Sequence, residues 1–138
     1  MGYSLIISAL IGAAAATSIS YDPGYDERAR SMSVVSCSDG INGLTTKHGW
    51  QIQGDVPNFP YIGGSDTIAG WNSASCGDCF AITYNSRTIH MLAIDHTLTG
   101  LNMAEAAMND LTGGQAVFLG RVEAEVVKVD AGLCGVTG

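Results

Sequence analysis

Basic side chains are scarce in this sequence, and their scarcity limits the partners it can have. Six Lys and Arg residues stand against thirteen Asp and Glu residues among 138, so the formal net charge is −7. Proteins that bind nucleic acid do so largely through basic side chains that neutralise phosphates. Nucleic acid is therefore not an expected partner, whereas a neutral or cationic polymer would suit the acidic chain.

Long apolar runs are also missing, apart from one segment near the start. Residues 5–16 are apolar or small, but a bilayer-spanning helix needs about 20 such residues, so no membrane span is expected. The segment has the length of a signal-peptide core, and Ala14-Ala15-Ala16 supplies small residues for cleavage. We predict a signal peptide over residues 1–16 and a secreted chain from about Thr17, although no Lys or Arg precedes Leu5. A buried N-terminal helix is the alternative.

Repeats, low-complexity tracts, proline-rich linkers and Asn-x-Ser/Thr sequons are absent after Thr17. The remaining residues, roughly 120, are enough for one hydrophobic core and too few for two. We predict a single domain over residues 17–138 and expect it to be a monomer. The 18 glycines are spread evenly, as expected of tight turns between short strands.

Only four cysteines and three histidines are present. In an exported chain of this size, Cys37, Cys76, Cys79 and Cys134 should form two structural disulfides, and the sequence alone leaves all three pairings open. A redox site is one alternative, because Cys76 and Cys79 form a C-x-x-C motif. A zinc site is another, but no histidine lies at a ligand-like spacing from the cysteines. Neither a metal nor a cofactor is expected.

Short β-branched or aromatic runs between turn residues predict a mainly β domain. We expect strands at 32–36, 80–84, 88–94, 116–119 and 121–129. In the last of these, Val122, Ala124 and Val126 alternate with charged residues, so one face should be buried. Asn85-Ser86-Arg87 should form the turn of a hairpin.

One helix is predicted from Asn102 to Leu111. Asn102 would cap its free N–H groups, Glu105 would complete a capping box, and Gly113 would end the helix in the left-handed conformation. Its buried face would consist of Met103, Ala106, Ala107 and Leu111. Strands with one or two short helices and no βαβ repeat are typical of a compact barrel or sandwich.

The most specific signal is the order of several motifs along the chain. They are SYDPGYD at 20–26, CSDGINGL at 37–44, NFPYIGG at 58–64, GWNSASCGDC at 70–79, LAIDHT at 92–97, GLNMAEAAMNDLTGGQAVFLGRV at 100–122 and the closing Cys134-Gly135. Together they cover essentially the whole mature chain and include all four cysteines. With these motifs in this order, the sequence resembles the cerato-platanin family.

This resemblance implies both a fold and a function. The fold is a six-stranded double-psi β-barrel with a few short helices, similar to the first domain of expansins, and the implied disulfides are Cys37–Cys76 and Cys79–Cys134. Family members are secreted by fungi, associate with the fungal cell wall, bind chitin or N-acetylglucosamine oligomers, loosen cellulosic material without evident hydrolysis and provoke plant defence. We therefore expect a non-catalytic glycan-binding protein, with partly deacetylated chitin and cellulose as further partners. Self-assembly at surfaces would be secondary.

Asp95 is the first candidate site residue. It follows the apolar run 92–94, so its carboxyl group should emerge into a surface groove. The resemblance matches it to the general acid of expansins and of endoglucanases that share the barrel. A strand-end Asp that binds a loop amide is the structural alternative. Five further glycan contacts are expected near the family's groove motifs: Asn72, Ser73, Gln53, Tyr25 and Asp22.

Aromatic rings could cover the apolar face of a sugar. Trp50, Trp71 and Tyr61 are candidates, although for any one aromatic residue of a small barrel burial in the core is the better explanation. His96 could tune the neighbouring Asp95, but it could also be an ordinary surface residue.

The sequence is compatible with two functions other than non-catalytic glycan binding. Glycoside hydrolysis normally needs two carboxylates, about 5 to 9.5 Å apart, and no short motif links a second one to Asp95. A weak endoglucanase with Asp95 as general acid is therefore an alternative. The other is an effector recognised by a plant receptor through an exposed surface such as residues 39–45, with glycan binding incidental.

Overall fold

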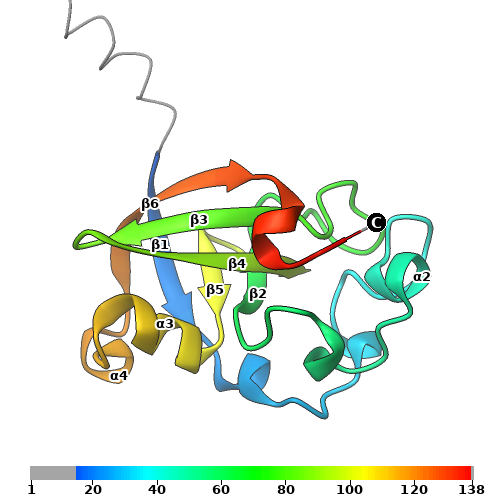
Figure 1. Ribbon diagram of the computed structural model, residues 1–138, viewed down its shortest axis with the longest axis horizontal. Coiled ribbons are helices and arrows are strands. Elements are labelled where there is room, and N and C mark those ends of the chain that lie inside the picture. Colours follow the sequence, from blue (N-terminus) through cyan, green and yellow to red (C-terminus); the bar gives the residue numbers. More distant parts are fainter. Residues whose placement is uncertain (1–14, 138) are drawn as a thin grey trace, which may run out of the picture.

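A closed β-barrel is the centre of the molecule in the computed structural model, which describes residues 15–137 (Figure 1). Its strands are β1 (Ala15–Tyr21), β2 (Ile62–Ser65), β3 (Cys79–Tyr84), β4 (Arg87–His96), β5 (Leu101–Met103) and β6 (Val122–Val129). They pair in the order β1-β5-β2-β4-β3-β6, and β6 closes the ring on β1. The predicted six-stranded double-psi barrel is confirmed.

Short helices connect and flank the strands. The α-helices are α2 (Leu44–His48), α3 (Glu105–Thr112) and α4 (Ala116–Leu119), and the 3₁₀ turns are η1 (Pro23–Asp26), η2 (Met32–Val34), η3 (Gln53–Asp55) and η4 (Ala131–Cys134). In Figure 1, α3 and α4 lie at one end of the barrel, and α2 lies beyond the opposite end. Long connections that carry η1, η2, α2 and η3 run between β1 and β2.

Close approach of the strands explains one glycine of β2. Gly63 pairs with Met103 of the antiparallel strand β5. A Cβ atom at Gly63 would lie 2.2 Å from the backbone oxygen of Asn102. Because no side chain fits at that distance, only glycine allows β2 and β5 to pair here.

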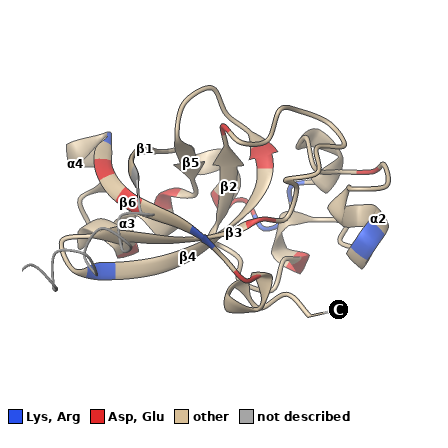
Figure 2. Cartoon of the chain, turned by 90° about the horizontal axis from the view of Figure 1, so that it is seen from above, with Lys and Arg blue, Asp and Glu red and all other residues tan. Residues whose placement is uncertain are grey.

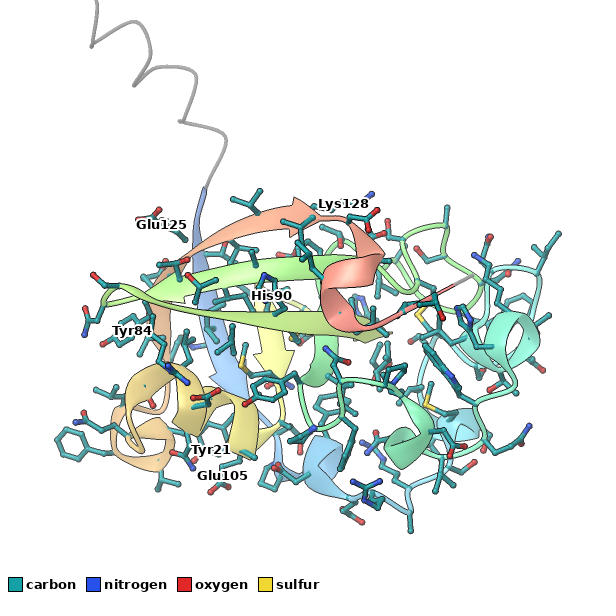
Figure 3. All side chains as sticks on the ribbon, in the orientation of Figure 1. Tyr21, Tyr84, His90, Glu105, Glu125 and Lys128 are labelled. Carbon is teal, nitrogen blue, oxygen red and sulfur yellow. A yellow bond between two sulfur atoms is a disulfide. The ribbon has the colours of Figure 1, made fainter. Side chains whose placement is uncertain are left out.

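The alternation of buried and exposed residues on β6 follows the sequence pattern. On β6, Val122 and Ala124 are buried and Val126 is half-buried, as predicted. Figure 3 shows Glu125 and Lys128 projecting from β6 away from the barrel. The β3–β4 hairpin is confirmed as well: Tyr84 pairs with Arg87, and the two residues between them have positive φ angles of 47° and 66°.

The far half of β4 is buried on both faces, and this places the candidate site. Residues 91–94 are all buried. The N–H of Cys37 donates to the Ile94 carbonyl (3.1 Å) and that of Gly77 to the Ala93 carbonyl (2.9 Å), so loops lie against this half of the strand. Asp95 is the first residue of β4 to emerge beyond this cover.

Both predicted disulfides are confirmed. Cys37 bonds to Cys76 and Cys79 bonds to Cys134, and no free cysteine occurs in residues 15–137. The alternative of a Cys76–Cys79 redox pair is therefore wrong. One disulfide joins the two loops outside β4, and the other anchors η4 to the start of β3.

Two predicted strands are wrong. Residues 32–34 form η2, because the Ser31 hydroxyl accepts a hydrogen bond from the N–H of Ser33 (3.1 Å). Residues 116–119 form α4, because Asn109 of α3 accepts the N–H of Ala116 (2.9 Å) and so caps a helical turn. In both places a hydrogen bond to a side chain outweighs the β propensity of the apolar residues.

The predicted start of α3 is wrong by three residues. Asn102 lies in β5, and Ala104 occupies the N-cap position without a side-chain cap. The cap comes instead from Asp26, whose carboxylate accepts the N–H groups of Glu105 (2.7 Å) and Ala106 (2.9 Å). Gly113 ends the helix with a φ of 70°, as predicted. The buried face differs too: Ala106 is exposed, whereas Ala107, Met108 and Leu111 are buried.

Most of the predicted signal peptide lies outside the described residues. Within residues 15–137, no helix combines the length and the apolar character that crossing a membrane requires.

Candidate functional site

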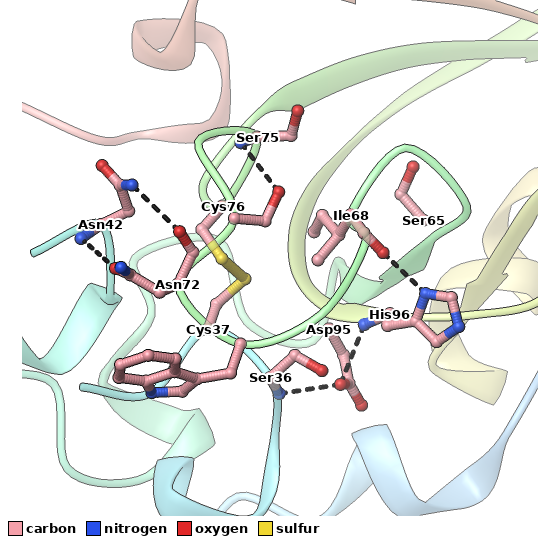
Figure 4. Close-up of a disulfide and its surroundings, with 12 residues drawn as sticks. Ser36, Cys37, Asn42, Ser65, Ile68, Asn72, Ser75, Cys76, Asp95 and His96 are labelled. Atoms are coloured by element: carbon pink, nitrogen blue, oxygen red, sulfur yellow. Dashed lines mark hydrogen bonds between the residues drawn. A yellow bond between two sulfur atoms is a disulfide. The ribbon is translucent and has the colours of Figure 1, made fainter. Parts of the chain in front are cut away.

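A carboxylate at the end of β4 is the centre of the candidate site. Oδ1 of Asp95 accepts the backbone N–H groups of Ser36 and His96, both at 2.9 Å, and Oδ2 accepts the hydroxyl of Tyr25 at 2.7 Å (Figure 4 shows the first two bonds). The side chain is half-buried, so it is fixed on one side and open on the other. Oδ1 already has two donors, and the free acceptor capacity is therefore at Oδ2, beside the Tyr25 hydroxyl.

Tyr25 lies in η1, which places its hydroxyl group at this site. Its side chain is only 4 % exposed. Burial of the ring and the hydrogen bond to Asp95 raise the pKa of Tyr25 far above its ordinary value. Tyr25 therefore acts as a permanent donor to Asp95 near neutral pH.

The raised pKa predicts a loss of stability at alkaline pH. In the unfolded chain a tyrosine ionises near pH 10, whereas folded Tyr25 keeps its proton to higher pH. The contribution of protonated Tyr25 to the unfolding free energy is therefore complete below about pH 10. Above that pH the unfolding free energy falls, by up to about 1.4 kcal/mol per pH unit for each such tyrosine. Tyr25→Phe should therefore make the decline in unfolding free energy above about pH 10 shallower, as measured by urea unfolding at several pH values. Equal slopes in both proteins would contradict this.

Two buried or capping groups hold η1 in place. The Gln53 side chain is completely buried, and its amide donates to the carbonyls of Gly24 (3.0 Å) and Glu27 (2.9 Å), on either side of Tyr25. Asp26 ties the same turn to α3 through its helix cap. A direct contact between Gln53 and a glycan is thus incompatible with this structure, and Gln53 instead positions Tyr25.

Asp22, which is exposed, and Arg30, which is half-buried, form the rim near Tyr25. Asp22 caps η1 by accepting the N–H of Gly24 (2.9 Å). The Arg30 guanidinium carbon lies 5.5 Å from the centre of the Tyr25 ring. Both side chains border Gly24, because a Cβ there would lie 3.2 Å from Asp22 and 3.0 Å from Arg30. Of the predicted contacts, Asp95, Tyr25 and Asp22 are thus brought into one neighbourhood.

The remaining two predicted contacts lie elsewhere. Figure 4 shows Asn72 and Asp95 on opposite sides of the Cys37–Cys76 disulfide. Asn72 Oδ1 accepts the N–H of Asn42 (2.9 Å), and the Asn72 carbonyl accepts the Asn42 amide (3.0 Å). The Ser73 hydroxyl accepts the N–H of Ser75 within the same loop (3.2 Å). These side chains mainly order the loops beside the disulfide.

The three candidate aromatic platforms differ in exposure. Trp50 is half-buried and stacks on His48, with the ring centres 4.3 Å apart. Tyr61 is half-buried and donates to Asp110 (2.6 Å), and this hydrogen bond, followed by burial, raises the pKa of Tyr61. Trp71 is 62 % exposed and is the one candidate that offers most of its ring to solvent.

His96 serves a structural contact in this arrangement. Its Nδ1 lies 2.6 Å from the carbonyl oxygen of Ile68, so it ties residue 68 to the end of β4 (Figure 4).

Within the described part of the chain, no group of three or more His, Cys, Asp or Glu side chains could hold a metal ion. Lys and Arg are scattered over the molecule in Figure 2 and do not form one patch.

Ser36, Arg30 and Asp26 were missed by the sequence analysis. Ser36 contributes a backbone N–H, which no side-chain pattern can reveal. Asp26 acts on residues about 80 positions away, so local cap signals point elsewhere. Arg30 could have been noticed as one of the few basic residues of an acidic chain.

Comparison with known proteins gives consistent matches over most of the chain. The family model Cerato-platanin matches residues 17–136. "Allergen Asp f 15" of Aspergillus fumigatus is 50% identical over 117 residues, which are 85% of this chain and 76% of that protein. The crystal structure of cerato-platanin 1 from M. perniciosa has 45% identity and a TM-score of 0.82, covering 86% of this chain and 98% of that one. "The solution structure of the fungal elicitor Cerato-Platanin" has 39% identity and a TM-score of 0.75, covering 85% and 95%.

Proposed function

The chain belongs to the cerato-platanin family, and we propose that it is a secreted, non-catalytic protein that binds chitin or N-acetylglucosamine oligomers around Asp95. The observation that supports this most is the anchored, half-buried carboxylate of Asp95 with free acceptor capacity at Oδ2. Sugar hydroxyl and acetamide N–H groups donate hydrogen bonds to such an oxygen. The exposed carboxylate of Asp22 and the guanidinium of Arg30 offer an acceptor and a donor on the same rim.

Catalysis is not part of the proposal, because Asp22, the second carboxylate of the neighbourhood, has one of its two oxygens committed to the cap of η1. Asp22 Oδ1 accepts the N–H of Gly24 as the cap of η1. A hydrolase needs its second carboxylate free to attack the sugar or to activate water. Wall loosening without cleavage would follow if binding at this site competes with contacts between polymer chains.

Asp95→Asn should abolish most of the glycan binding and leave the fold intact. The Asn carbonyl can accept the two N–H groups that Oδ1 accepts, so the local structure is preserved. The charge is lost, and a hydrogen bond to a charged group contributes about 1.5–3 kcal/mol, so affinity should fall about tenfold or more. Amide shifts of ¹⁵N-labelled protein titrated with N-acetylglucosamine oligomers measure this, even at millimolar affinity.

A matched control separates the site from the overall charge. Glu123→Gln removes one negative charge from an exposed position of β6 and should bind like the unchanged protein. If no oligomer shifts any amide of the folded, unchanged protein, the binding proposal is wrong. New reducing ends in the same samples, lost in Asp95→Asn, would instead make the protein a weak glycan-cleaving enzyme.

Provocation of plant defence is the second part of the proposal. A solved relative with 39% identity is described as a fungal elicitor. We propose that this protein acts in the same way when it reaches plant tissue, and that a plant receptor is a partner. The test is to infiltrate leaves with folded protein and, separately, with heat-treated, reduced protein, and to measure the plant defence response. Only the folded form should trigger that response.

A further inference from the structure

Trp71 is an exposed ring held in a fixed position. Its Nε1 donates to Oδ1 of Asp39 at 2.6 Å, and the ring lies against Gly40. A Cβ at Gly40 would be 2.9 Å from Cζ2 of Trp71 and 2.7 Å from Oδ1 of Asn72. Gly40 also has a φ of 82°, so this position is reserved for glycine and the ring can approach the backbone closely.

The two loops that carry this ring are clamped to each other. Asn42 donates two hydrogen bonds to Asn72, and the Cys37–Cys76 disulfide joins the same loops a few residues away. Asn72 itself has a φ of 63°, a conformation that few residues other than glycine adopt. An exposed apolar side chain without a function would not need its loops to be held by hydrogen bonds and a disulfide. A ligand, by contrast, binds more tightly to a ring that is already ordered.

A polar hollow adjoins the ring at Asp39. It has a volume of about 330 Å³ and is lined by Ser31, Ser33, Ser38, Asp39, Thr45 and Gln51. The Ser38 hydroxyl and the Gln51 side-chain amide have no hydrogen-bond partner among residues 15–137, and Asp39 uses only one of its carboxylate oxygens. Hydroxyl, amide and carboxylate groups of this kind match the hydroxyl groups of a sugar.

We propose that Trp71 and this hollow form a second glycan subsite, in which a pyranose ring stacks on the indole and its hydroxyl groups bind Asp39, Ser38 and Gln51. Aromatic rings with a polar edge suit a ligand that is apolar on one face and polar around its rim. The residues that line the hollow all carry polar side chains, which can bind the hydroxyl groups around the rim of a sugar. The subsite extends the glycan binding proposed for Asp95, but it lies on the other side of the disulfide and can be tested alone.

The two tryptophans make the test direct, because each gives one indole N–H signal. ¹⁵N-labelled protein is titrated with hexamers of N-acetylglucosamine and with cellohexaose. We expect the Trp71 indole and the amides of 38–42 to shift in a saturable manner, with the Trp50 indole unchanged. Trp71→Ala should weaken retention on insoluble chitin about tenfold, as expected for removal of a central aromatic anchor. Its fold is checked by circular dichroism and by the unchanged Trp50 signal.

Asp95→Asn distinguishes this subsite from the first one. In that variant the Trp71 signal should still shift, even where the amides around residue 95 no longer respond. The inference is overturned if neither oligomer shifts the Trp71 indole, whether or not the amides near Asp95 respond. It is also overturned if Trp71→Ala keeps full glycan retention but no longer triggers plant defence, which would make this surface a contact for a host protein.

Discussion

Replacement of Gly100 by alanine should prevent the barrel from closing. Gly100 has a φ of 66°, and a Cβ there would lie 2.0 Å from the carbonyl oxygen of Ser18 in β1. The residue cannot shift easily, because its N–H donates to Asp66 Oδ2 (2.8 Å) and its carbonyl accepts the N–H of Asp66 (3.0 Å). We expect a loss of at least about 4 kcal/mol in unfolding free energy, which is a large part of the total for one domain.

Gly113→Ala is the matched control for this effect. Gly113 has nearly the same φ, 70°, but nothing lies within 4 Å of a Cβ placed there. Its substitution should lower the unfolding free energy only by the strain of a positive φ, about 1 to 2 kcal/mol. Urea unfolding followed by circular dichroism measures both variants. Equal losses would mean that backbone strain alone, and not the approach of β1 to β5, reserves position 100 for glycine.

The strands that sequence reasoning found are those that show their pattern locally. The β3–β4 hairpin and β6 have β-branched residues in alternation and a two-residue turn between β3 and β4. β1 could have been found in the same way, since Thr17, Ile19 and Tyr21 alternate with serines. β2 and β5 could not, because β2 contains two glycines and β5 has only three residues. Both exist because their neighbours in the barrel supply the hydrogen bonds.

In the candidate site, too, the features with a local sequence pattern were predicted, and those that depend on distant segments were not. Asp95 lies at the end of an apolar strand, as predicted, because the burial of 92–94 can be read from their side chains. Its carboxylate is half-buried and accepts the loop N–H of Ser36, which is the contact that the structural alternative described. The partners of Asp95 come from residues 25 and 36, which pack against it only in the folded barrel. Exposure likewise separates Trp71 from Trp50, although nothing in their local sequence does. Pairings and exposures that depend on distant segments therefore need the structure.

Removal of either disulfide should be strongly destabilising. The bonds Cys37–Cys76 and Cys79–Cys134 close loops with sequence separations of 39 and 55 residues. In the chain-entropy model each contributes about 4 kcal/mol by restricting the unfolded chain. We expect the double variants Cys37→Ala/Cys76→Ala and Cys79→Ala/Cys134→Ala to lose similar amounts of unfolding free energy, as measured by urea unfolding.

The two variants should differ at the proposed glycan subsite. Cys37–Cys76 joins the loops that hold Trp71, whereas Cys79–Cys134 fixes η4 to β3. Loss of the first bond should therefore speed amide hydrogen exchange at 38–42 and 70–76 and weaken the glycan-induced shift of the Trp71 indole. Loss of the second should leave both unchanged under conditions where the protein stays folded. If the two variants affect the Trp71 loops equally, the disulfides act only through global stability, and the Asn42–Asn72 hydrogen bonds with the Trp71–Asp39 contact must be sufficient to hold the ring.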